Sequence, residues 1–76
     1  MTSLFIKLKT IDDVKDFVKK ANAVSYEADL SIGKYTIDAK SIMGIFSLDL
    51  SRPLTLSIHS DDCKDFIEEI SAYIVK

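Results

Sequence analysis

A single serine, Ser41, stands directly before the apolar run Ile42-Met43-Gly44-Ile45-Phe46 in the middle of the chain. A serine in this position is typical of a helix N-cap, where its hydroxyl accepts a hydrogen bond from a backbone N–H of the first turn. The same hydroxyl could carry a phosphoryl group, which the free amides and the dipole of a helix N-terminus stabilise. Ser41 therefore has two interpretations, a plain N-cap and a regulatory phosphorylation site.

Other side chains that could take part in catalysis or metal binding lie in the last third of the chain. His59 is the only histidine, and a neutral imidazole is a phosphoacceptor near about pH 7, but its place in an alternating strand favours a solvated histidine on an open sheet face. Cys63 is either a reactive thiol at a helix N-terminus or, as we expect, a small packing residue. Asp61, Asp62 and Asp65 could bind a cation, but a solvated first turn that matches the helix dipole is the better interpretation. We expect neither a metal site nor a cofactor.

The apolar run after Ser41 divides into two faces at helical spacing. Ile45 and Leu48 are three residues apart and are expected to point inward. Ile42, Met43 and Phe46 share the other side, which a short helix on a small domain must expose. An exposed apolar patch usually marks a contact surface, so these three residues are predicted to bind a protein partner.

Periodicity along the chain predicts the elements that position these residues. Alternating apolar and polar residues predict strands over residues 4–9, 24–31, 35–39 and 54–59, with a tight turn at Gly33. Helical spacing predicts helices over residues 11–22 and 41–50, and Thr10 and Asp13 have the spacing of a capping box. A last helix is predicted to be capped by Ser60 or Asp61, with an apolar stripe of Phe66, Ile67, Ile70, Tyr73 and Ile74.

One apolar face per strand and one stripe per long helix imply two layers. The predicted fold is α+β, an open-faced sandwich with a four-stranded antiparallel sheet and three helices on one face. The inward-facing side chains predict the following core: Leu4, Ile6, Val14, Phe17, Val18, Leu30, Ile37, Ile45, Leu48, Leu56, Ile58, Phe66, Ile67 and Ile70.

Length and composition limit the classes of function. The 76 residues allow one domain, residues 1–76, and a formal net charge of -2 argues against nucleic-acid binding. The apolar runs are too short to span a membrane, and no signal peptide is recognisable at the start. A lone cysteine excludes an internal disulfide. We expect a cytoplasmic protein.

The segment Lys40-Ser41-Ile42-Met43-Gly44, followed by Phe46-Ser47-Leu48, resembles the regulatory-serine segment of HPr, the small phosphocarrier of bacterial sugar phosphotransferase systems. The predicted order of strand, helix, strand, strand, helix, strand, helix is also that of HPr. The resemblance runs from about Phe17 to the C-terminus, and residues 24–50 align without a gap. It implies an HPr-like fold, a partner surface on the second helix and regulatory phosphorylation at Ser41.

The resemblance does not extend to the catalytic loop. HPr carries its phosphoryl group on a histidine between the first strand and first helix, followed by arginine and proline. In this chain Lys9 ends the strand and Thr10 begins the helix, so that loop is missing, and Asp12 and Asp13 would repel a phosphate. This condition is similar to that of Crh, a family member that lacks the histidine and keeps the serine.

These observations predict a protein that is not an enzyme but a non-catalytic, regulatory binding module. Its expected partner is a serine kinase, a transcription regulator or a phosphotransferase-system protein, and the chain is expected to be a monomer or weak homodimer. Two alternatives stay open: a phosphocarrier that uses His59, and a structural domain that homodimerises through its second helix.

Overall fold

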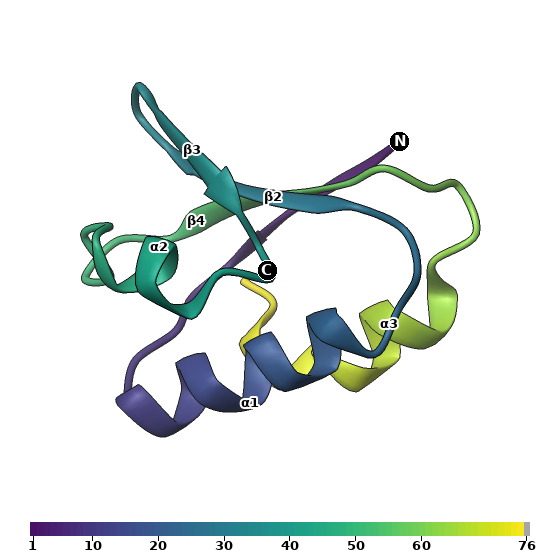
Figure 1. Ribbon diagram of the computed structural model, residues 1–76, viewed down its shortest axis with the longest axis horizontal. Coiled ribbons are helices and arrows are strands. Elements are labelled where there is room, and N and C mark those ends of the chain that lie inside the picture. Colours follow the sequence, from purple (N-terminus) through teal and green to yellow (C-terminus); the bar gives the residue numbers. More distant parts are fainter. Residues whose placement is uncertain (76) are drawn as a thin grey trace.

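The computed structural model describes residues 1–75, in which two layers can be distinguished (Figure 1). Strands β1 (Thr2–Ile6), β2 (Ala28–Ile32), β3 (Tyr35–Asp38) and β4 (Leu54–Ile58) form one antiparallel sheet in the order β1-β4-β2-β3. Helices α1 (Ile11–Asn22), α2 (Ile42–Phe46) and α3 (Lys64–Glu69) lie on one side of it, with a short 3-10 turn at Ser71–Tyr73. The predicted open-faced α+β sandwich is confirmed.

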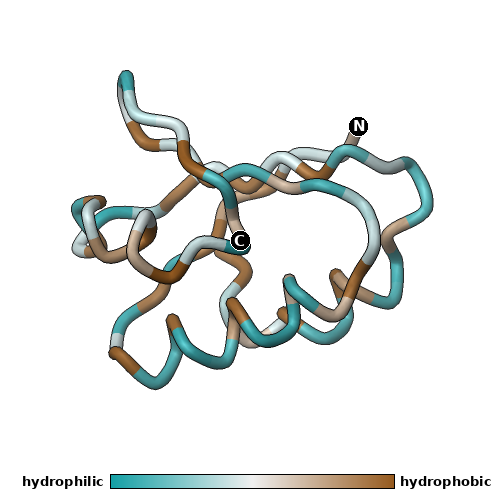
Figure 2. The backbone as a smooth tube through the Cα atoms, viewed as in Figure 1, coloured by the Kyte–Doolittle hydropathy of each residue, from teal (hydrophilic) through white to brown (hydrophobic). Residues whose placement is uncertain are grey.

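The core lies between the sheet and the helices, where apolar residues of both layers meet (Figure 2). Rows of paired residues cross the sheet, and Leu4, Leu56, Leu30 and Ile37 form the central row on the inner face. The buried side chains are Ile6, Leu8, Val14, Phe17, Ala21, Ala28, Leu30, Ala39, Ile45, Leu48, Leu54, Leu56, Ile58, Cys63, Phe66 and Ile70.

The predicted core was wrong in part, because Leu4, Ile37, Val18 and Ile67 are only half-buried. Leu4 and Ile37 belong to β1 and β3, the two edge strands, which have a sheet neighbour on one side only. Val18 and Ile67 lie at the margins of the apolar stripes of their helices. The prediction also missed buried residues, namely Leu8, Ala21, Ala28, Ala39, Leu54 and Cys63.

The second helix is half as long as predicted and ends at Phe46 instead of Leu50. Side chains after it make local hydrogen bonds that compete with helix continuation. Ser47 Oγ donates to the carbonyl of Gly44 at 2.6 Å. The backbone N–H and the hydroxyl of Ser51 both donate to Asp49 Oδ1, at 3.1 and 2.6 Å. The chain therefore turns towards β4 before Pro53.

The predicted cap of the last helix was also wrong. Helix α3 begins at Lys64 with Cys63 at its N-cap, and no side chain caps it. Ser60 Oγ instead accepts a hydrogen bond from the N–H of Asp62 at 3.1 Å, and the Asp61 carboxylate pairs with the N-terminal ammonium at 2.5 Å. Both candidate caps thus have other partners, one of them from the far end of the chain.

The predicted stripe to Ile74 is not one helix, because α3 ends at Glu69 and the chain after Tyr73 joins the sheet. Ile74 forms an isolated antiparallel bridge with Ile6. The N–H of Lys7 donates to the carbonyl of Tyr73, and the N–H of Val75 donates to the carbonyl of Phe5, both at 2.8 Å. The C-terminal segment therefore covers part of the free edge of β1 and reduces its exposed backbone.

Tyr73 attaches this C-terminal segment to α1. Its hydroxyl donates to Asp16 Oδ2 at 2.5 Å, and Lys20 Nζ lies 2.8 Å from the same oxygen. The hydrogen bond from Lys20, followed by the one from Tyr73, lowers the pKa of Asp16. The hydrogen bond to Asp16, with a smaller effect of burial, raises the pKa of Tyr73 to about 12.

We expect this contact to make the protein less stable at strongly alkaline pH. A phenol with a raised pKa contributes its full stabilisation below the unfolded value of about 10, and the contribution is lost as the pH rises through its folded value. Tyr73→Phe should lower the free energy of unfolding by about 0.5–1.5 kcal/mol near neutral pH. The difference between parent and variant should shrink between about pH 10 and pH 12 in urea unfolding. Tyr35→Phe is the control, and a pH-independent effect of Tyr73→Phe would contradict the assignment.

Candidate functional site

Ser41 occupies the N-cap of α2, as predicted. Its backbone is extended, and its Oγ accepts a hydrogen bond from the N–H of Gly44 at 3.1 Å. A Cβ at Gly44 would lie 3.1 Å from Ser41 Oγ and 3.4 Å from Ile37 Cβ, so a larger residue here would crowd the Ser41 cap. Ser41 is exposed to solvent.

The residue before Ser41 is held against the end of α1. Lys40 Nζ donates to the carbonyl of Val24 at 3.1 Å, and the Lys40 N–H donates to Asp38 Oδ1 at 2.9 Å. Asn22 Nδ2 lies 3.4 Å from the carbonyl of Lys40 and donates to it. These contacts join α1, β3 and the start of α2, so the position of Ser41 is set by three elements.

Helix α2 and the turn that follows it divide their apolar side chains between core and solvent. Ile45 and Leu48 are buried, whereas Met43 is 76% and Phe46 40% exposed, as predicted. The prediction for Ile42 was wrong in part, because its side chain is half-buried and packs against the core. We refer to Met43, Phe46 and the accessible part of Ile42 as the second-helix surface.

The N-terminus of α1 is capped by the protein's own carboxylate. Asp13 Oδ2 accepts hydrogen bonds from the N–H groups of Lys9 and Thr10, at 3.0 and 3.3 Å. Thr10 Oγ1 accepts one from the N–H of Asp13 at 3.0 Å, which completes the predicted capping box. The first strand ends at Ile6 and not at Lys9 as predicted, so residues 7–10 connect β1 to α1. An anion approaching this helix end would meet the charges of Asp12 and Asp13.

His59 lies far from that helix end. It follows β4 at the end where Ile58 pairs with Thr2, whereas Leu54 at the other end pairs with Ile6, just before α1. As predicted, it is exposed on the open face of the sheet. Its Nε2 donates to Asp29 Oδ2 at 2.7 Å, a pairing that alternation within one strand cannot reveal.

The remaining candidates are placed by their packing and charge. Cys63 is buried, in agreement with the packing interpretation. The hydrogen bond from the N-terminal ammonium lowers the pKa of the Asp61 carboxyl. Within residues 1–75, no three His, Cys, Asp or Glu side chains gather in a way that could hold a metal ion. No helix in the same range has the length and apolar composition of a membrane span.

Comparison with known proteins shows the family to which the chain belongs. The family model described as "PTS HPr component phosphorylation site" matches residues 14–76. The chain belongs to the HPr family. No curated protein matches it in sequence. This is the phosphocarrier family of the phosphotransferase system, and its HPr proteins are not themselves enzymes.

Solved structures of HPr-family proteins are similar to the chain over most of its length. HPr-C-His from Thermoanaerobacter tengcongensis is 28% identical with a TM-score of 0.79, over 95% of this chain and 89% of that one. HPr from Bacillus anthracis is 23% identical with a TM-score of 0.72, over 97% and 96%. Crh from Bacillus subtilis is 27% identical with a TM-score of 0.67, over 90% and 80%. The resemblance of the chain from Phe17 onward to HPr is thereby confirmed.

Proposed function

We propose that this HPr-family protein is a regulatory binding module that does not relay phosphoryl groups. Its proposed action is to dock a protein partner on the second-helix surface. The partner would be a serine kinase, a transcription regulator or another protein of the phosphotransferase system. The Bacillus subtilis relative Crh is described as a catabolite repression protein, which supports a regulatory role for this chain.

The main support is the state of the α1 N-terminus. A phosphocarrier needs a histidine at a place where free amides and cations receive the phosphate. Here the N–H groups of Lys9 and Thr10 already donate to Asp13, and Asp12 adds a second negative charge in the first turn. The only histidine follows the opposite end of β4. This helix end thus has no histidine to carry a phosphoryl group, and the charges of Asp12 and Asp13 oppose an incoming phosphate.

The second-helix surface supports the binding role. Exposed Met43 and Phe46 are side chains of the types enriched at protein interfaces, and Met adapts its shape to different partners. Buried Ile45 and Leu48 keep the helix seated on the domain, so the surface is presented on a rigid support.

Ser41 is proposed to regulate this surface by phosphorylation. Its exposed hydroxyl lies two residues before Met43 along the chain, and a phosphate there would bring about two negative charges to the edge of the apolar patch. Such a group repels acidic partners and attracts those that present arginine. Modification would therefore change the choice of partner.

The test is a phosphotransfer assay with phosphoenolpyruvate and the first enzyme of the sugar phosphotransferase system. We expect no acid-labile phosphate on this chain, while a histidine-bearing HPr in the same mixture becomes labelled. His59→Ala tests the alternative that His59, which is hydrogen-bonded to Asp29, accepts the phosphoryl group. Acid-labile label that disappears in His59→Ala would show a displaced phosphocarrier and overturn the proposal.

A further inference from the structure

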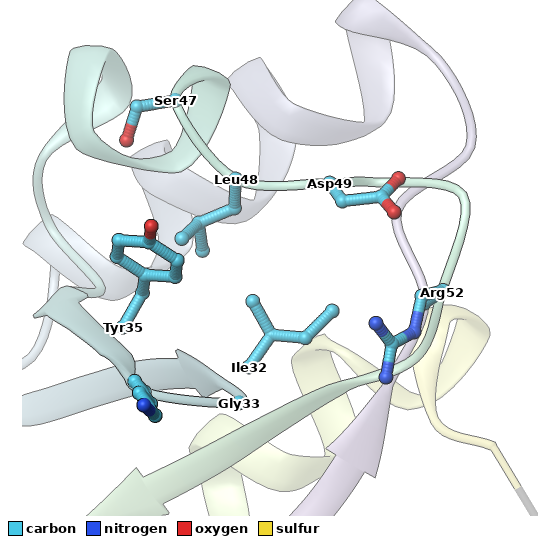
Figure 3. A pocket seen from close by; sticks show the side chains of 8 residues that line it. Ile32, Gly33, Tyr35, Ser47, Leu48, Asp49 and Arg52 are labelled. Carbon is cyan, nitrogen blue, oxygen red and sulfur yellow. The ribbon is translucent and has the colours of Figure 1, made fainter.

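A cavity of about 500 Å³ lies between the β2–β3 hairpin and the segment that leads from α2 to β4 (Figure 3). The hairpin contributes Ile32, Lys34 and Tyr35, and its turn depends on Gly33, whose φ of 58° is left-handed. The opposite wall is formed by residues 47–49 and Arg52. The volume is in the range of small-molecule sites, about 300–1,000 Å³.

The floor and one wall of this cavity are apolar. Ile32 and Leu48 project towards each other across its middle, and the ring of Tyr35 closes one side (Figure 3). Tyr35 is 71% exposed, so its ring face is available for contact. An aromatic or aliphatic group seated here would gain apolar burial and stacking on the ring.

The charges at the rim favour an anion. Lys34 and Arg52 both line the cavity, and neither forms an ion pair with an acidic side chain within residues 1–75. The Arg52 guanidinium is turned towards Ile32, and the Asp49 carboxylate lies at the rim on the side of Arg52 (Figure 3). Hydrogen bonds from Ser51 occupy that carboxylate and, with a smaller effect of the Arg52 charge, lower the pKa of Asp49, so one negative charge at the rim stands against the two positive charges of Lys34 and Arg52. The cavity is therefore locally positive in a chain whose net charge is -2.

We propose that this cavity binds a small organic anion. The apolar body of the ligand rests on Ile32, Leu48 and the ring of Tyr35, its phosphate or carboxylate group is held by Arg52, and Lys34, which also lines the cavity, adds to the positive charge. A guanidinium binds either anion with two parallel hydrogen bonds, and a lysine adds a second charge. This site is independent of the proposed docking function, because its ligand is a small molecule and its residues lie outside the second-helix surface.

The experiment is a titration of the isotope-labelled protein with phenyl phosphate, followed by backbone amide chemical shifts. We expect saturable shifts centred on Gly33, Lys34, Tyr35, Leu48 and Arg52. Inorganic phosphate, which lacks the body, and benzyl alcohol, which lacks the charge, should each bind at least about tenfold more weakly. Phenylacetate in place of phenyl phosphate shows whether the carboxylate or the phosphate is the better anionic group.

Variants distinguish the site from general attraction of anions. Arg52→Ala should weaken phenyl phosphate binding by about tenfold or more, and Arg52→Lys by less, while Lys64→Ala on α3 should leave it unchanged. Tyr35→Ala should weaken phenyl phosphate but not inorganic phosphate. Amide spectra of the free variants verify that each is folded. Equal effects of Arg52→Ala and Lys64→Ala, or equal affinity for phenyl phosphate and inorganic phosphate, would overturn the proposal.

Discussion

Replacing Phe66 by alanine is expected to lower the free energy of unfolding by about 3–5 kcal/mol. Its side chain is buried, and its ring centroid lies 6.2 Å from those of both Phe17 and Tyr26. Phe66 thus joins α3 to α1 and to the segment before β2. The truncation removes these contacts and leaves a cavity that the rigid sheet cannot close. Since small domains have about 5–15 kcal/mol of stability in total, the variant should be near the limit of folding.

Phe17→Ala should have a similar effect, because Phe17 is buried at the centre of α1. Chemical denaturation of both variants, followed by circular dichroism, measures the loss. Phe5→Ala is the matched control, since Phe5 is 58% exposed on the open face of the sheet. We expect this control to change stability by only about 0.5 kcal/mol. If Phe66→Ala unfolds at the same denaturant concentration as Phe5→Ala, the core assignment is wrong.

The second large effect concerns partner binding. Met43→Asp should weaken the complex with the partner by about 30-fold or more, which corresponds to a hot-spot loss of about 2 kcal/mol. Met43 is the most exposed large apolar side chain in the part of the chain that the structure describes. A carboxylate in its place would have to be desolvated within an apolar contact. Calorimetric titration against candidate kinases, regulators and phosphotransferase-system proteins measures the change, and Phe46→Ala should act in the same direction.

Phe5→Asp is the control for this experiment, because it places the same charge on the open face of the sheet, away from α2. A partner that binds Met43→Asp as tightly as the parent shows that the second-helix surface is not the docking site. Ser41→Asp tests the regulatory part separately. If Met43→Asp weakens binding but Ser41→Asp leaves every affinity unchanged, the surface is retained and Ser41 is only an N-cap.

Interactions between close neighbours along the chain could be predicted from the sequence. The order of strands and helices follows from periods that are properties of the backbone itself. The two caps at Thr10 and Ser41 each join a side chain to an N–H three residues later, so spacing alone identifies them. The inward direction of Ile45 and Leu48 follows from the same local geometry. The family resemblance also depended on a contiguous segment around Ser41.

Only the tertiary structure decided what distant residues do to one another. Tyr73 and Asp16 are 57 positions apart, and the N-terminal ammonium and Asp61 are 60 apart, yet each pair is in contact. The first contact holds the C-terminal segment against α1, and the second engages a residue that local spacing assigns to a helix cap. Likewise, the cavity needs Ile32 and Arg52 from separate elements. Local periodicity specifies which face of each element is apolar, but the partner of each face depends on how the whole chain packs.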